Sequence, residues 1–215
     1  MDKMRVIEKK IDKVKCNKTT ELYLGGLKLT KIPDTVWTLD WLEKLYLNDN
    51  NISLPDDIVK LRKLKMLVLD NNQLTTLPNC ISELTDLEVL TLAFNQLTTL
   101  PNNIGKLNKL HTLSLGFNQL TIFPDCILEL SNLKRLGLDD NQLTYLPDNI
   151  GNLSNLVELY LSSNELTYLP VSFWKLKRLN TLYLRNNPIT NLIQSVNLFS
   201  TTKEHKNNEL FQGRR

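Results

Sequence analysis

The chain has 215 residues, of which 41% are hydrophobic, and it carries a formal net charge of +3. No run of about 18 apolar residues is present and the first residues are broken by charge, so the sequence favours a protein that is made in a cytosol, without a membrane span or a secretory signal. Three cysteines without CxxC spacing argue against a disulfide framework and against a structural zinc site.

Residues 1–18 are predicted to form an amphipathic helix. Met4, Ile7, Ile11 and Val14 recur at helical spacing, and lysines surround them. Such a helix can cover the exposed end of a repeat array, or it can lie on an anionic membrane surface. The apolar stripe is narrow and contains no aromatic residue, which favours the cap.

Residues 19–192 contain an internal repeat. From Leu64 onward, five stretches of 23 residues share one pattern: LKMLVLDNNQLTTLPNCISELTD, LEVLTLAFNQLTTLPNNIGKLNK, LHTLSLGFNQLTIFPDCILELSN, LKRLGLDDNQLTYLPDNIGNLSN and LVELYLSSNELTYLPVSFWKLKR. Two less regular copies precede them, and residues 179–192 form a shortened eighth copy. A fixed period of this length indicates a solenoid, because each unit can bury its apolar face only against its neighbours.

Each copy contains the pattern of one short strand. Leu90 and Leu92 recur at a period of two, with the polar Thr91 between them, which is typical of a strand with one buried face. Leu97 and Leu100 add a second apolar pair, and Pro101 then prevents a helix from continuing there. Stacking of these units predicts one parallel sheet along the concave side of the solenoid.

An asparagine recurs where the chain turns away from each strand. The column is Asn50, Asn72, Asn95, Asn118, Asn141, Asn164 and Asn187. A buried turn leaves backbone donors and acceptors unpaired, and an amide side chain can satisfy both kinds. We interpret the column as structural, because a residue repeated in every coil cannot form a single active site.

The consensus LxxLxLxxNxLxxLPxxIxxLxx, which covers residues 19–192, resembles the leucine-rich repeat family. It is most similar to the 23-residue subtype of Ras-suppressor-like proteins and of bacterial host-directed effectors. The resemblance implies an α/β solenoid: a horseshoe of about eight coils with a parallel concave β-sheet, an N-terminal capping helix in residues 1–18 and a short C-terminal cap. Similar bacterial ubiquitin ligases join their repeats to a separate catalytic domain, and nothing after residue 192 is long enough to be that domain.

Residues 193–215 are predicted to hold the end of this cap and a polar tail. Leu192, Val196 and Phe199 supply apolar side chains for the cap, and the tail starts at Ser200.

Two of the cysteines occupy one repeat position. Cys80 and Cys126 are two coils apart, which separates them by roughly 10 Å, too far for a disulfide. Asn103, Asn149 and Ser172 fill the same position in other coils, so we predict that both thiols are reduced and lie at or near the surface.

The third, fifth, seventh and eighth residues of each copy are expected to line the concave surface. Small residues at the middle of the fifth-position column predict a low floor with tyrosines at both ends, and Phe94 and Phe117 on adjacent coils are expected to stack beside it. Carboxylates rim this floor. The candidate partner-binding residues are Phe94, Phe117, Tyr145, Tyr160, Tyr168, Tyr183, Asp49, Asp70, Asp139, Asp140 and Arg135.

Composition and motifs favour a binding module over an enzyme. No phosphate-binding glycine loop, HExxH or GxSxG motif is present, and two histidines supply few candidates for a general base. Neither a catalytic residue, a metal nor a cofactor is predicted. The repeat body has a formal charge of −3, because the positive charge lies in residues 1–18 and 193–215, and this argues against nucleic acid.

We therefore expect a monomeric, non-catalytic protein-interaction module whose partner is a protein with a basic or amphipathic surface. The role that fits is a bacterial effector or adaptor, cytoplasmic or secreted into the cytosol of a host cell. Two alternatives are the substrate-recognition part of a ubiquitin-ligase system and a signalling scaffold of the Ras-suppressor type.

Overall fold

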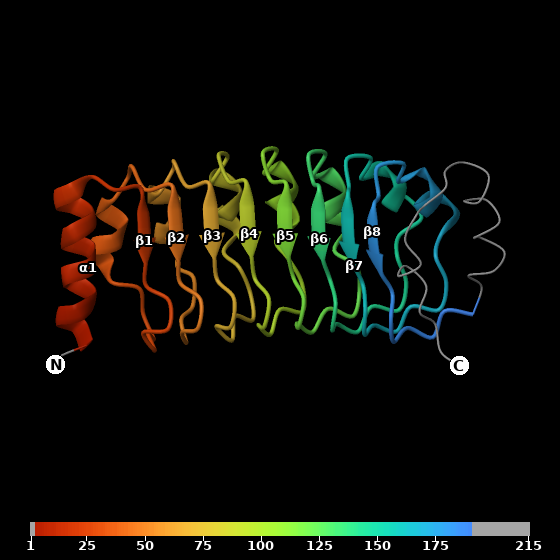
Figure 1. The fold of residues 1–215 in the computed structure, drawn as a ribbon, viewed down its shortest axis with the longest axis horizontal. Helices are drawn as coiled ribbons and strands as arrows, with labels where there is room; N and C mark the ends of the chain where they lie inside the picture. Colours follow the sequence, from red (N-terminus) through yellow and green to blue (C-terminus); the bar gives the residue numbers. More distant parts are fainter. Residues whose placement is uncertain (1–2, 191–215) are drawn as a thin grey trace.

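Residues 3–190 are described by the computed structural model, and they form one elongated stack of coils (Figure 1). The helix α1 (Lys3–Asn17) comes first, and each coil then contributes a three-residue strand. The strands are β1 (Glu21–Tyr23), β2 (Lys44–Tyr46), β3 (Met66–Val68), β4 (Val89–Thr91), β5 (Thr112–Ser114), β6 (Arg135–Gly137), β7 (Glu158–Tyr160) and β8 (Thr181–Tyr183).

Short 3₁₀ helices return the chain to the next strand on the opposite side of each coil. They are η1 (Asp34–Thr38), η2 (Asp56–Lys60), η3 (Asn79–Glu83), η4 (Asn102–Lys106), η5 (Asp125–Glu129), η6 (Ile150–Asn152) and η7 (Val171–Lys175). Six of the seven 3₁₀ helices begin directly after a proline in the extended conformation. This extended proline fixes the residue at which each helix starts.

The eight strands pair in parallel and in chain order to make a single sheet. Equivalent repeat positions face each other, so that Leu90 pairs with Leu67 on one side and with Leu113 on the other. The leucines of this column are buried from Leu22 to Leu159, and they form a continuous ladder inside the solenoid. The predicted α/β solenoid with a parallel sheet is confirmed.

The recurring asparagine holds neighbouring coils together. Oδ1 of Asn95 accepts a hydrogen bond from the backbone N–H of Leu74 at 2.8 Å, and Nδ2 donates to the carbonyls of Leu69 and Leu92 at 3.0 Å each. Asn118 and Asn141 make equivalent contacts one and two coils further on. The interpretation of this column as structural is correct, because its amide groups satisfy backbone groups that the turn leaves unpaired.

The helix α1 covers the first coil and packs beside β1 (Figure 1). Ile7, Ile11 and Val14 are buried against the repeat core, as their spacing predicts. Met4 was expected in the same stripe, but its side chain is 48% exposed. The buried stripe thus begins at Ile7, about one turn later than predicted.

The predicted C-terminal cap, with Leu192, Val196 and Phe199, and the tail within residues 193–215 lie outside the described residues. Within residues 3–190, no helix combines the length and the apolar character that a membrane crossing requires.

The three cysteines differ in environment, which corrects the prediction for one of them. All three are unpaired; Cys16 is exposed and Cys80 is half-buried, whereas Cys126 is buried. The surface location expected for Cys126 was therefore wrong. Burial raises the pKa of the Cys126 thiol to about 11, and burial together with a hydrogen bond to Asp56 does the same for Cys80, so both remain protonated and weakly nucleophilic at neutral pH.

Candidate functional site

Three pairs of stacked aromatic rings lie on or beside the concave sheet. Tyr23 and Tyr46 stack at the N-terminal end with ring centroids 4.3 Å apart, and Tyr160 and Tyr183 stack at the C-terminal end at 5.2 Å. The third pair follows the central strands β4 and β5. Between the two tyrosine pairs the fifth-position residues are smaller (Val68, Thr91, Ser114 and Gly137), so the floor is lowest near the middle of the sheet.

The central pair is formed by Phe94 and Phe117. Their ring centroids are 4.1 Å apart with an interplanar angle of 10°, and the side chains are 54% and 41% exposed. The stacking that the repeat period predicted is present. An exposed stack of this kind offers a flat apolar surface of two rings to a partner.

The backbone under both phenylalanines is left-handed. The eighth residue of every coil has a positive φ, between 50° and 69°: Gly26, Asp49, Asn71, Phe94, Phe117, Asp140, Ser163 and Asn186. Most coils place glycine, asparagine or aspartate there, which tolerate this conformation. A bulky side chain in it costs roughly 1–2 kcal/mol, so the two phenylalanines sit where local backbone preference disfavours them.

Asp70 lies one coil before the phenylalanine pair, and its carboxylate is used inside the protein. It accepts hydrogen bonds from the Thr91 hydroxyl and from the backbone N–H of Ala93, each at 2.7 Å. The side chain is half-buried, and burial raises its pKa above the ordinary range for aspartate despite these two bonds. Asp70 was predicted as a partner-binding residue, but its two oxygens already position the segment that leads to Phe94.

Substitution of Asp70 separates its structural role from its charge. We expect Asp70→Ala to lower the free energy of unfolding by about 1–3 kcal/mol, because the Ala93 N–H loses its acceptor. Asp70→Asn keeps an acceptor oxygen and removes the charge that burial opposes, so it should be at least as stable as the parent at neutral pH. Urea unfolding measures both.

The pH dependence supplies the control. A folded-state pKa above the unfolded value favours the parent at low pH, and this contribution is lost as pH rises toward the folded pKa. The advantage of Asp70→Asn over the parent should therefore grow as pH rises from about 4, the ordinary aspartate pKa, through the raised pKa of the folded state. An advantage that shrinks as pH rises would contradict burial as the dominant influence on this carboxylate.

Asp139 and Asp140 lie one coil after the pair. A Cβ placed on Gly116 would lie 2.8 Å from Oδ2 of Asp139, so the glycine before Phe117 makes room for this carboxylate. Burial raises the pKa of Asp139, and the nearby charge of Asp140 adds to the effect. Carboxylates thus flank the two rings along the solenoid axis on both sides.

The remaining charges on the sheet are mostly paired. Arg135 makes a two-pronged ion pair with Glu158, with N···O distances of 2.6 and 2.7 Å, and Lys44 binds Glu21 at 2.7 Å. Tyr160 donates its hydroxyl hydrogen to Glu158 at 2.8 Å. Arg135 and Tyr160 therefore face a partner as parts of one network, rather than as separate groups.

The structure does not bring all the predicted site residues together. Asp49 accepts hydrogen bonds from Asn71 and Asn48, which lower its pKa, and it lies two coils from Phe94. Tyr145 and Tyr168 are 41% and 43% exposed, but they lie outside the strands, in the segments between the asparagine turn and the following proline. They flank the sheet instead of lining it with Tyr160 and Tyr183.

Two features of this face were not predicted from the sequence. One is the positive φ at the eighth position, for which the glycine, asparagine and aspartate residues of that column were an available signal. The other is a hollow between α1 and β1, for which the sequence holds no signal.

Residues 3–190 contain no group of three or more histidine, cysteine or acidic side chains that would hold a metal ion.

Two family models for leucine-rich repeats match the chain, one described as a leucine-rich repeat region over residues 20–120 and one as a leucine rich repeat over residues 131–189. Together with the stacked coils and the asparagine ladder, they define a leucine-rich repeat solenoid. The chain belongs to the leucine-rich repeat family. No curated protein sequence matches it.

Several solved structures share the fold. An internalin (InlF) of Listeria monocytogenes is 26% identical with a TM-score of 0.70 over 84% of this chain and 52% of its own. Internalin C2 of the same organism is 27% identical with a TM-score of 0.74, over 83% of this chain and 76% of its own. The ectodomain of the Arabidopsis thaliana receptor kinase GASSHO1/SCHENGEN3, in complex with CASPARIAN STRIP INTEGRITY FACTOR 2, is 29% identical with a TM-score of 0.61 over 80% of this chain and 24% of its own. The chain thus spans about half of the first internalin and about a quarter of the plant ectodomain.

Proposed function

We propose that the chain is a non-catalytic protein-binding module that holds its partner on the concave face, anchored at the Phe94–Phe117 stack. One observation carries the proposal: two exposed, stacked aromatic side chains occupy a left-handed backbone position that disfavours them. Residues kept in an unfavourable backbone conformation are often kept for function. Exposed aromatic residues are also the residues that most often dominate the energy of protein interfaces.

The carboxylates around the stack favour a basic or amphipathic partner. Arginine fits this arrangement best, because its planar guanidinium group can stack on an aromatic ring and bind a carboxylate at the same time. Asp139 and Asp140 lie one coil from Phe117 and supply that carboxylate. The acidic concave columns also disfavour nucleic acid, whose backbone requires aligned basic residues.

The biological setting that we propose is that of a monomeric bacterial effector or adaptor, cytoplasmic or delivered into the cytosol of a host cell. Its support is the likeness to internalins of a bacterium and the cytosol-compatible thiols. The plant receptor ectodomain, which is solved in complex with CASPARIAN STRIP INTEGRITY FACTOR 2, supports a peptide or protein as the class of partner. A substrate-recognition role in a ubiquitin-ligase system and a scaffold of the Ras-suppressor type remain the alternatives.

Panning a random peptide library on the full chain tests the proposal without a known partner. Selection on the parent, with counter-selection on the Phe94→Asn/Phe117→Asn variant, should enrich peptides that carry arginine or lysine next to an aromatic residue. The enriched peptides should bind the parent saturably in titration calorimetry and bind the variant at least tenfold more weakly. If every enriched peptide binds both proteins equally, the phenylalanine anchor is refuted, and enrichment of acidic peptides that bind the variant more weakly would refute the charge preference.

A further inference from the structure

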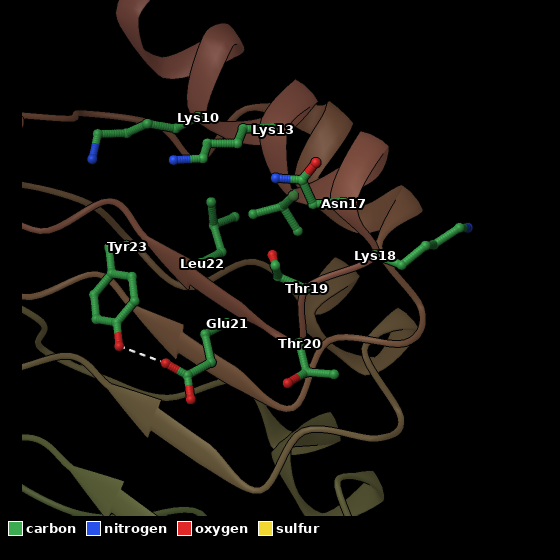
Figure 2. A pocket seen from close by; sticks show the side chains of 10 residues that line it. Lys10, Lys13, Asn17, Lys18, Thr19, Thr20, Glu21, Leu22 and Tyr23 are labelled. Carbon is green, nitrogen blue, oxygen red and sulfur yellow. Dashed lines mark hydrogen bonds between the residues drawn. The ribbon is translucent and has the colours of Figure 1, made fainter.

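A hollow of about 690 Å³ lies between α1 and the first strand, at the N-terminal end of the concave face (Figure 2). Val14 and Leu22 contribute its apolar part, and Lys10, Lys13 and Asn17 of α1 line its helix side. Thr19 and Thr20 add hydroxyl groups. The hollow is therefore rich in hydrogen-bond donors and adjoins the Tyr23–Tyr46 stack of the sheet.

The positive charge of this hollow is not balanced from within. Figure 2 shows the Lys10 and Lys13 ammonium groups projecting to the same side, over the strand that carries Tyr23, while Lys18 points away. Lys18 instead lies over the Trp41 ring, 4.0 Å from its centroid. Glu21 is the acidic residue among those that line the hollow, and its carboxylate is already bound by Lys44 at 2.7 Å and by the Tyr23 hydroxyl at 2.6 Å.

The acidic residues of α1 are on the other side of the helix. Glu8 and Asp12 both lie about 160° around the helix axis from Lys10, and they lie about 140° and about 100° from Lys13, because successive residues of an α-helix turn by about 100°. The buried stripe of Ile7, Ile11 and Val14 lies between them and the hollow. Both carboxylates therefore lie outside the lysine side of the helix that lines the hollow.

We propose that this hollow binds a carboxylate-bearing, acidic segment of the protein partner, with Lys10 and Lys13 pairing its charge and Asn17 and the threonine hydroxyls donating hydrogen bonds. The hollow opens onto the same concave face as the phenylalanine stack. The strands β1 and β4 are three strand spacings apart, or roughly 14 Å, which an extended segment of about four or five residues spans. This proposal depends on the proposed function in one respect only, that the partner is a protein.

An anionic membrane is the competing occupant, and the packing of α1 disfavours it. Binding of an amphipathic helix to a membrane needs an apolar face that enters the lipid. In this chain Ile7, Ile11 and Val14 are buried by the first coil, so the helix has no free apolar stripe to insert. An acidic protein segment requires only the ammonium groups and donors that the hollow offers.

The test is a titration of the ¹⁵N-labelled full chain with a hexaglutamate peptide, followed by amide chemical shifts. We expect saturable, salt-sensitive shifts centred on Lys10–Tyr23. Lys10→Gln/Lys13→Gln should weaken binding by about fivefold to tenfold, the effect of losing two partly exposed ion pairs. The matched control is Arg5→Gln/Lys15→Gln, which removes the same charge from two residues of α1 that do not line the hollow and should leave the affinity unchanged.

Three results would overturn the site. The first is that hexaglutamate gives no saturable amide shifts, and the second is that both double variants weaken its binding equally. The third is that phosphatidylserine vesicles shift the α1 amides whereas hexaglutamate does not. Lys10 and Lys13 are exposed, so their substitution leaves the buried stripe intact, and unchanged amide positions in β4–β8 would verify the fold. The Phe94→Asn/Phe117→Asn variant should bind hexaglutamate like the parent. Failure of the phenylalanine anchor and failure of this site are therefore distinguishable.

Discussion

Exchange of Phe94 and Phe117 for asparagine is expected to weaken partner binding by about 2 kcal/mol or more, the usual scale for an interface hot spot. The fold should survive, because both side chains are about half exposed and the buried leucine ladder is untouched. Asparagine is the suitable replacement, since Asn71 and Asn186 already occupy the equivalent left-handed position with φ values of 56° and 57°. Relief of backbone strain should offset the lost ring stacking to within about 1 kcal/mol.

The measurement is titration calorimetry with a peptide or protein that the parent binds, together with thermal unfolding of each variant. Val171→Asn serves as the control, because it removes an apolar side chain that is 86% exposed in η7, on the opposite side of the coil from the strands. If the double variant melts at a lower temperature but keeps its affinity, the phenylalanines only cover the turn. The binding site would then have to be sought among Tyr145, Tyr160, Tyr168 and Tyr183.

Removal of α1 is expected to have the largest effect on stability. The helix packs against β1 and covers the apolar end of the first coil, so a chain without it would expose buried residues such as Leu22, and it should aggregate. The point variant Ile11→Ala should lower the free energy of unfolding by about 2–4 kcal/mol, because Ile11 is only 1% exposed and its loss leaves a cavity.

Met4→Ala is the matched control within the same helix. Met4 is 48% exposed, so its truncation should change the free energy of unfolding by less than about 0.5 kcal/mol. Urea unfolding, with the slope checked for two-state behaviour, measures both variants. A truncated chain that stays soluble with an unchanged melting curve would show that α1 is not needed as a cap.

Much of the fold can be predicted from the repeat, because the same residue pattern recurs in every copy and specifies the same local structure each time. The alternation of Leu90 and Leu92, the proline after each second apolar pair and the asparagine column predict strand, turn and stacking direction together. The stacking of Phe94 on Phe117 follows as well, since equivalent residues of adjacent coils must lie one strand spacing apart.

The sequence by itself therefore determined the features that repeat along the chain, which are the solenoid, its buried leucine ladders and the columns of residues on its concave face. Only the tertiary structure decided which of these side chains are free to meet a partner. Asp70 is engaged by Thr91 and Ala93, while Arg135 is held by Glu158. The hollow beside α1 also depends on how a helix without a repeat counterpart packs on the first coil. The physical reason is that a hydrogen bond between coils forms or fails on differences of a few tenths of an ångström in the donor–acceptor distance, and the repeat period does not specify distances that finely.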